Sequence, residues 1–174
     1  MKTLWWYTDL DKTKIKKEIS KVINIGRIDT ANYCRIFEKK IEKFLGVKHV
    51  ITVSNGSMAN VLVFMALGLK NNDEIIIPNI GWISVINSCK ILGLKPVLVD
   101  VDPKRPLLNI SEIEKNITKK TKAILVVHFA GIPCDMNPII KLAKKYKLKI
   151  KEDCAHAIET EYKNKKTGTF GETG

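Results

Sequence analysis

The chain has 174 residues, with 30 Lys+Arg against 18 Asp+Glu, which gives a formal net charge of +12. Because 45% of its residues are hydrophobic, the composition excludes an intrinsically disordered chain. No apolar run reaches the roughly 18 residues that a membrane-spanning helix needs, and the apolar patch at the start is too short for a signal peptide. The length fits a single domain of roughly 100–200 residues.

The surplus of positive charge is spread along the chain. Lysines alternate with apolar residues at helix or strand spacing, in segments such as KTKIKKE and AKKYKLKIK. This pattern is typical of the solvated faces of amphipathic elements. Since no stripe of aromatic residues lies between the lysines, we expect no nucleic-acid partner.

The cysteines and histidines show no ligand or disulfide pattern. The four cysteines are widely spaced, without a C-x-x-C pair: Cys34, Cys89, Cys134 and Cys154. Without a secretory signal, reduced thiols in a cytoplasmic protein are the expectation. The three histidines lack zinc-ligand spacing to these cysteines, so we expect no metal site.

The first part of the chain is predicted to be helical. Residues 11–24 and 33–45 carry apolar residues at helical spacing, and the two helices are expected to stop at Gly26 and Gly46. The apolar face of the first helix consists of Ile15, Ile19, Val22 and Ile23. The second helix is expected to bury Ile36, Phe37, Ile41, Phe44 and Leu45. We therefore assign residues 1–46 to an N-terminal helical segment and residues 47–174 to an α/β domain.

The remainder alternates between short β-rich runs and helical stretches. Strands are predicted at residues 47–53, 74–77, 96–99, 123–127 and 148–151. Helices are predicted at residues 58–69 and 82–92 (the latter buried), after a capping box at Ser111–Glu114, and after a cap at Asp135. Continuous apolar strands separated by helices indicate an α/β fold, a mostly parallel sheet with helices on both faces. No element follows to cover the last strand, so we expect this α/β unit to be incomplete at its C-terminus.

Ligands of an open parallel sheet bind beyond the carboxyl ends of its strands. The residues that follow the predicted strands are Ser54–Ser57, Pro78–Trp82, Asp100–Asp102, His128 and Asp153–His156. Because these ends meet at one edge of the sheet, we expect the functional site there.

The segment Asn55-Gly56-Ser57 follows the first predicted strand and opens a helix. Gly56 lets the backbone approach a ligand closely, Ser57 adds a hydroxyl, and the N–H groups of the first helical turn suit an anion. The segment can equally be an ordinary helix N-cap. It matches neither the P-loop pattern nor the dinucleotide-binding glycine pattern.

Asp153 ends the last predicted strand, whose apolar neighbours Leu148 and Ile150 indicate burial. A buried carboxylate is costly unless it is paired with a cation. A protonated heterocyclic nitrogen, as in pyridoxal phosphate (PLP), is one such partner. The alternatives are a cap for the following turn and a salt bridge to a nearby lysine.

Three other residues near the strand ends have two interpretations each. His156 lies three residues after Asp153, so a helical turn would place both on the same side. His156, His128 and Trp82 can each serve a ligand, or can be structural residues of the kind found in most cores.

Four stretches agree in order and spacing with one known family: residues 26–69, 71–102, 117–158 and 167–174. They include the segments VSNGSMAN, PNIGW and KEDCAHAI. On these segments the chain resembles the DegT/DnrJ/EryC1/StrS family of sugar aminotransferases, over about the first half of a typical member. The resemblance implies the large domain of the PLP-dependent transferase fold type I.

The resemblance also implies a binding site for pyridoxal 5′-phosphate. Gly56, Ser57 and Met58 match the turn that holds the cofactor phosphate. Trp82 matches an aromatic position that packs on the pyridine ring. The chain departs from the family at Glu159 and at Asn72, where members mostly have glycine.

The resemblance assigns catalytic roles to Asp153, which matches the partner of the pyridine nitrogen, and to His156, close to the ring and its phenolic oxygen. The family segment S-F-x-x-x-K, which carries the Schiff-base lysine, is expected just past Gly174. We therefore expect an N-terminal fragment that is inactive alone.

A member of this family is expected to be a cytoplasmic homodimer in amino-sugar or surface-polysaccharide biosynthesis. It transfers an amino group, typically from glutamate, to a nucleotide-linked keto-sugar, and it needs no membrane, metal or nucleic acid. Two alternatives remain open: a PLP-dependent sugar dehydratase of the same family, and a non-catalytic remnant or regulatory protein.

Overall fold

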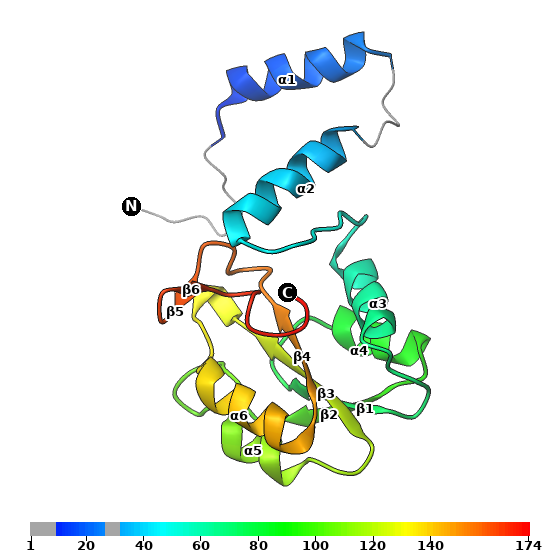
Figure 1. The fold of residues 1–174 in the computed structure, drawn as a ribbon, viewed down its shortest axis with the longest axis vertical. Coiled ribbons are helices and arrows are strands. Elements are labelled where there is room, and N and C mark those ends of the chain that lie inside the picture. Colours follow the sequence, from blue (N-terminus) through cyan, green and yellow to red (C-terminus); the bar gives the residue numbers. More distant parts are fainter. Residues whose placement is uncertain (1–9, 27–31) are drawn as a thin grey trace.

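The computed structural model describes residues 10–26 and 32–174 and is built around a parallel sheet (Figure 1). The sheet has four strands in the order β2-β1-β3-β4. Their bounds are Glu74–Pro78 for β1, Lys95–Val99 for β2, Thr121–Val127 for β3 and Lys149–Asp153 for β4. The predicted α/β class and four of the predicted strands are thereby confirmed.

The strands bury both of their faces. Successive side chains of a strand point to opposite sides of the sheet, so Ile75 and Ile77 join one apolar cluster and Ile76 joins the other. Burial on both sides requires a continuous apolar run, which the sequence of β1 supplies.

Helices cover both faces of the sheet, as predicted (Figure 1). On one face, α3 (Gly56–Ala66) and α4 (Ser84–Ile91) contribute Phe64, Val85 and Cys89 to the core. On the other face, α5 (Ile110–Lys115) and α6 (Met136–Tyr146) contribute Ile113, Met136, Ile139 and Leu142. The short elements are a 3-10 turn at Phe129–Gly131 and a hairpin of β5 (Glu161–Tyr162) and β6 (Lys165–Lys166).

The two N-terminal helices form where expected, as α1 (Lys12–Asn24) and α2 (Asn32–Leu45). The prediction that the second helix buries its apolar face is wrong for the part of the chain described, since Phe37 stays 53% exposed. Both helices lie at one end of the molecule, away from the sheet (Figure 1). Helical periodicity shows which face is apolar, but says nothing about what covers it. No described helix is long and apolar enough to cross a membrane.

The strand predicted at residues 47–53 does not form; this stretch pairs with no strand of the described sheet. Its Thr52 N–H instead donates to the Glu38 carboxylate of α2, at 2.8 Å. The outer edge of β4 is occupied by the last residues of the chain, since Glu152 N–H donates to Thr173 O at 2.9 Å. A strand needs a neighbour's backbone, which local β propensity cannot supply.

Two helix starts differ from the capping predictions. Asn109, not Ser111, caps α5, and its side chain accepts from the Ser111 N–H at 3.1 Å. Asp135 sits at the N-cap of α6 but makes no capping hydrogen bond, and its carboxylate accepts from the Tyr162 hydroxyl. Asn72 stands where members of the family that the sequence resembles mostly have glycine. Its φ of 69° is left-handed, and asparagine is among the non-glycine residues that most readily adopt this conformation.

Helix α6 ends at Lys147, which adopts a left-handed conformation (φ 56°, ψ 41°). Glycine has no Cβ to strain there, so Lys147→Gly is expected to raise the free energy of unfolding by about 1 kcal/mol in urea denaturation. Lys144→Gly, in the last helical turn, is the matched control and should lower it by about 1 kcal/mol. Equal losses in both variants would contradict the assignment.

Candidate functional site

Trp82 lies beside a cavity at the carboxyl edge of the sheet. The cavity has a volume of about 170 Å³ and is lined by the ends of β1 and β3, by Trp82 and by α4. The predicted buried helix at residues 82–92 begins only at Ser84, so Trp82 precedes it and is 74% exposed. A large aromatic side chain exposed beside an apolar cavity is available to pack on a planar ligand.

Asp153 ends β4 and is the register partner of Val127, which lines the cavity. Its Oδ1 accepts from the Ala155 N–H at 3.1 Å, and its Oδ2 lies 3.4 Å from Lys151 Nζ. Both structural alternatives, the turn cap and the salt bridge to lysine, are therefore present. Since the side chain is still 20% exposed, the carboxylate stays within reach of a ligand.

The N-terminus of α3 is capped by the Asn55 side chain, which accepts from the Met58 N–H at 3.0 Å. The N-cap interpretation is thus confirmed, and the Met58 N–H is occupied. Within residues 10–26 and 32–174, the N–H groups of Gly56 and Ser57 have no acceptor. A Cβ on Gly56 would meet nothing within 4 Å, so the space beside the Gly56 Cα is open.

A hydrogen bond ties the first turn of α3 to α4. The Ser88 hydroxyl of α4 lies 3.1 Å from the Ser57 carbonyl oxygen and 2.8 Å from the Ser84 carbonyl oxygen of its own helix, so its one hydrogen is shared between the two. Because Trp82 leads directly into α4, this contact links the candidate phosphate turn to the helix beside the cavity. The structure thereby connects two parts of the predicted site, since Ser57 and Trp82 lie 25 residues apart in the sequence.

His156 follows β4 in a turn, not in the helical turn that its spacing from Asp153 suggested. Its Nδ1 accepts from the Ala130 N–H at 3.3 Å, and its ring meets the Phe129 ring edge-on with centroids 5.7 Å apart. Because Nδ1 is the acceptor in this hydrogen bond, the donor nitrogen of the ring is Nε2. His156 is exposed, so that N–H can donate to a ligand.

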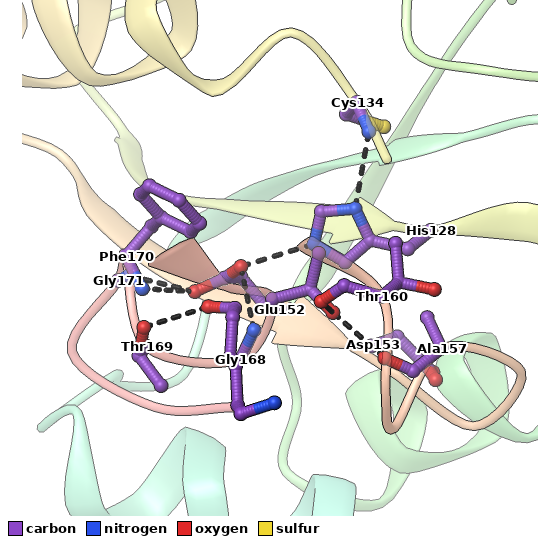
Figure 2. Close-up of polar contacts among 12 residues, drawn as sticks. His128, Cys134, Glu152, Asp153, Ala157, Thr160, Gly168, Thr169, Phe170 and Gly171 are labelled. Carbon is purple, nitrogen blue, oxygen red and sulfur yellow. Dashed lines mark hydrogen bonds and ion pairs between the residues drawn. The ribbon is translucent and has the colours of Figure 1, made fainter. Parts of the chain in front are cut away.

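The most extensive polar network surrounds Glu152, which sequence reasoning missed (Figure 2). Its Oε1 accepts from the N–H groups of Phe170 (2.7 Å) and Gly171 (2.8 Å). Its Oε2 accepts from the Gly168 N–H (2.9 Å) and from His128 Nε2 (3.0 Å). Burial by itself would raise the pKa of the Glu152 carboxyl, but these hydrogen bonds outweigh it and lower the pKa.

Of the two interpretations of His128, a ligand-binding residue or a structural one, the contacts favour the structural one, and the side chain is buried. Its Nδ1 accepts from the Cys134 N–H at 3.1 Å, so the proton resides on Nε2 and points at Glu152 (Figure 2). Glu152 itself ties the backbone of Gly168, Phe170 and Gly171 to β4. Gly171 is required there, since a Cβ would lie 2.4 Å from the Ile150 carbonyl oxygen.

His128, Glu152 and Cys154 come within 4.8 Å of one another, a grouping that their spacing along the chain did not suggest. The Glu152 oxygens are already taken by four donors. Burial, with the nearby Glu152 carboxylate, raises the pKa of the Cys154 thiol to about 12, whereas metals bind the thiolate. His128 and Glu152 are therefore members of a hydrogen-bonded structural network, and Cys154 lies next to it. All four cysteines of the chain are free.

Comparison with known proteins gives a consistent result. Residues 9–174 match the DegT/DnrJ/EryC1/StrS aminotransferase family. The chain is 44% identical over 141 residues to the GDP-perosamine synthase of Escherichia coli O157:H7, an alignment that covers 81% of this chain and 39% of that protein.

Solved structures agree in fold. An aminotransferase from Psychrobacter cryohalolentis matches with a TM-score of 0.88 and 31% identity, over 97% of this chain and 42% of that one. The E. coli GDP-4-keto-6-deoxy-D-mannose-3-dehydratase with bound hydrated PLP matches with a TM-score of 0.87 and 30% identity, over 95% of this chain and 44% of that one. The chain thus spans about two fifths of the length of these proteins.

These likenesses confirm the expected fold, that of PLP-dependent fold type I enzymes. Together with the match over residues 9–174, they establish that the chain belongs to the DegT/DnrJ/EryC1/StrS aminotransferase family.

Proposed function

We propose that this chain is the cofactor-binding part of a PLP-dependent aminotransferase that acts on a nucleotide-linked keto-sugar. The observation that carries the proposal is the Asp153 carboxylate, accessible at the end of β4 and paired across the strands with Val127 of the cavity wall. A carboxylate there can hold the proton of a heterocyclic nitrogen, which makes a pyridine ring the fitting ligand.

The residues present fit the cofactor at its other end too. The N–H groups of Gly56 and Ser57, the Ser57 hydroxyl and the positive end of the α3 dipole suit a phosphate. Met58 belongs to this turn, but its N–H is already bonded to Asn55, so only its half-exposed side chain can contribute.

Between these two ends, the side chains orient the ring. Trp82 would pack on its face, and the His156 Nε2–H would donate to its phenolic oxygen. Asp153 would keep the proton on the ring nitrogen. When bound, PLP supplies an electron sink that makes the hydrogen on the substrate carbon adjacent to nitrogen acidic.

The rest of the proposal concerns the whole protein. The relative from E. coli O157:H7 is named a GDP-perosamine synthase, which supports a nucleotide sugar as the amino acceptor. We propose glutamate as the amino donor, a homodimer as the assembly, the cytoplasm as the location, and amino-sugar or polysaccharide biosynthesis as the role. The Schiff-base lysine would come from a part of the protein beyond these 174 residues.

The test is a PLP titration of the full-length protein. Binding should produce a visible absorbance band, and borohydride should convert it to a stable adduct on a lysine that peptide mapping identifies. Heat-denatured protein is the control for surface lysines. If native protein yields no specific lysine adduct, the aminotransferase proposal fails.

A sugar dehydratase of the same family is the second candidate, favoured by the 30% identity to the E. coli 3-dehydratase. The two reactions differ in product. Incubation with ¹⁵N-glutamate and a GDP-linked 4-keto-6-deoxy sugar separates them: an aminotransferase places ¹⁵N on the sugar, whereas a dehydratase removes a hydroxyl and leaves the sugar without that nitrogen.

A further inference from the structure

Lys151 is a buried lysine in the middle of β4. It is only 7% exposed, and its Nζ lies 3.4 Å from Asp153 Oδ2. Its register partner on β3 is Leu125, which belongs to the apolar cluster under α3 and α4. Register partners of parallel strands point to the same side, so Lys151 enters this apolar face. A buried ammonium group is costly unless an anion pairs with it.

Asp153 is the anion that compensates this charge. Burial is the largest influence on the Lys151 amine and lowers its pKa, whereas Asp153 acts in the opposite direction. The titratable groups around it are Asp153, Glu152 and Cys154 on or next to its own strand, and on this face the Cys89 thiol of α4, whose pKa burial raises to about 11. The residues paired with Lys151 on the two sides of β4 are Leu125 and Thr173, and neither carries a charge.

On the basis of the proposed function, we propose that Lys151 is a positioning residue. Its ammonium group holds the Asp153 carboxylate until a pyridinium ring takes the place of that ammonium group. The ring N–H⁺ then pairs with Asp153, and the Lys151 ammonium releases one proton to solvent and becomes a neutral amine. No bond other than this N–H bond is broken. The summed charge of the Asp153 carboxylate, the Lys151 amine and the ring nitrogen after binding equals the summed charge of Asp153 and Lys151 before it.

The physical reason is that two cations compete for one carboxylate, of which only 20% is exposed. A ring nitrogen bonded to Asp153 would lie within a few ångströms of Lys151 Nζ, where like charges repel strongly because little solvent screens them. Burial already disfavours the charged form of the amine. The amine therefore gives up its proton, while the ring keeps the proton that its chemistry needs.

The experiment measures binding of 4-deoxypyridoxine 5′-phosphate to the full-length protein by calorimetry. This probe lacks the aldehyde, so it cannot react with any lysine. Titrations in two buffers of different ionisation enthalpy give the number of protons released. Wild type should release about one proton more than Lys151→Met. Lys151→Met should bind about tenfold more tightly, and Lys151→Arg, whose charge cannot be lost, about tenfold more weakly.

The controls separate this proposal from the function on which it rests. Lys149→Met removes an exposed lysine of the same strand and should change neither quantity. Equal proton release and equal affinity in wild type and Lys151→Met would overturn the role of Lys151. If Lys151→Met does not fold, Lys151→Arg decides, because affinity equal to wild type also overturns it. If Asp153→Asn binds the probe as wild type does, or wild type does not bind it, the proposed function itself fails.

Discussion

Replacement of Asp153 by asparagine is expected to lower kcat/KM for amino transfer in the full-length protein by about 10²- to 10³-fold. The amide carries no charge, so it cannot hold a proton on the ring nitrogen, and the ring becomes a weaker electron sink. Steady-state kinetics with saturating PLP measures the effect. Asp73→Asn, at the opposite edge of the sheet just before β1, is the matched control and should leave kcat/KM unchanged.

The stability of this variant must be separated from its activity. Asp153→Asn also leaves Lys151 buried without its carboxylate, so some loss of stability is expected. The double variant Lys151→Met/Asp153→Asn removes that unpaired charge and should regain stability without regaining activity. Turnover of Asp153→Asn within about threefold of wild type would refute the role of Asp153.

The second large effect is expected at Glu152, where Glu152→Gln should lower the free energy of unfolding by about 3 kcal/mol. Each carboxylate oxygen accepts two hydrogen bonds, from N–H groups that cannot accept in return. The amide NH₂ of glutamine would face two donors whichever way it turned. His128 cannot switch tautomer to relieve this, because its Nδ1 already accepts from Cys134.

Urea denaturation checks this expectation, with Glu172→Gln as the matched control. Glu172 directly follows residues 168–171, but its carboxylate is partly exposed, and glutamine can still accept from the Ile150 N–H. Its substitution should cost less than about 0.5 kcal/mol. Losses of equal size in the two variants would show that the network around Glu152 adds no stability.

The same carboxylate predicts a pH dependence. The folded-state pKa of Glu152 is lowered from its usual value of 4.5, so its contribution to stability is present above that pH. It is lost as the pH falls through the lower folded-state value, because protonation removes an acceptor. The stability difference between wild type and Glu152→Gln should therefore narrow as the pH falls below about 4.5.

Asp153 shows how much of the candidate site can be predicted from the local sequence. Its place at the end of a parallel strand was predictable, since strand ends follow from apolar runs and ligands bind beyond them. Its immediate partners were not. The same carboxylate could cap a turn, pair with a lysine or bind a ring, and the structure shows that it does the first two.

By itself, the sequence determined the α/β class, four of the five predicted strands and the helices between them. Those features depend on periodicity and burial pattern, which neighbouring residues carry. Only the tertiary structure decided that residues 47–53 stay unpaired, that α2 leaves its apolar face exposed among the described residues, and that Glu152 gathers donors from His128 and residues 168–171. The hydrogen bonds among these features join residues 14 or more positions apart in the sequence. A hydrogen bond needs a partner group nearby, and an apolar face is buried only if another element packs on it, so the tertiary structure decides both.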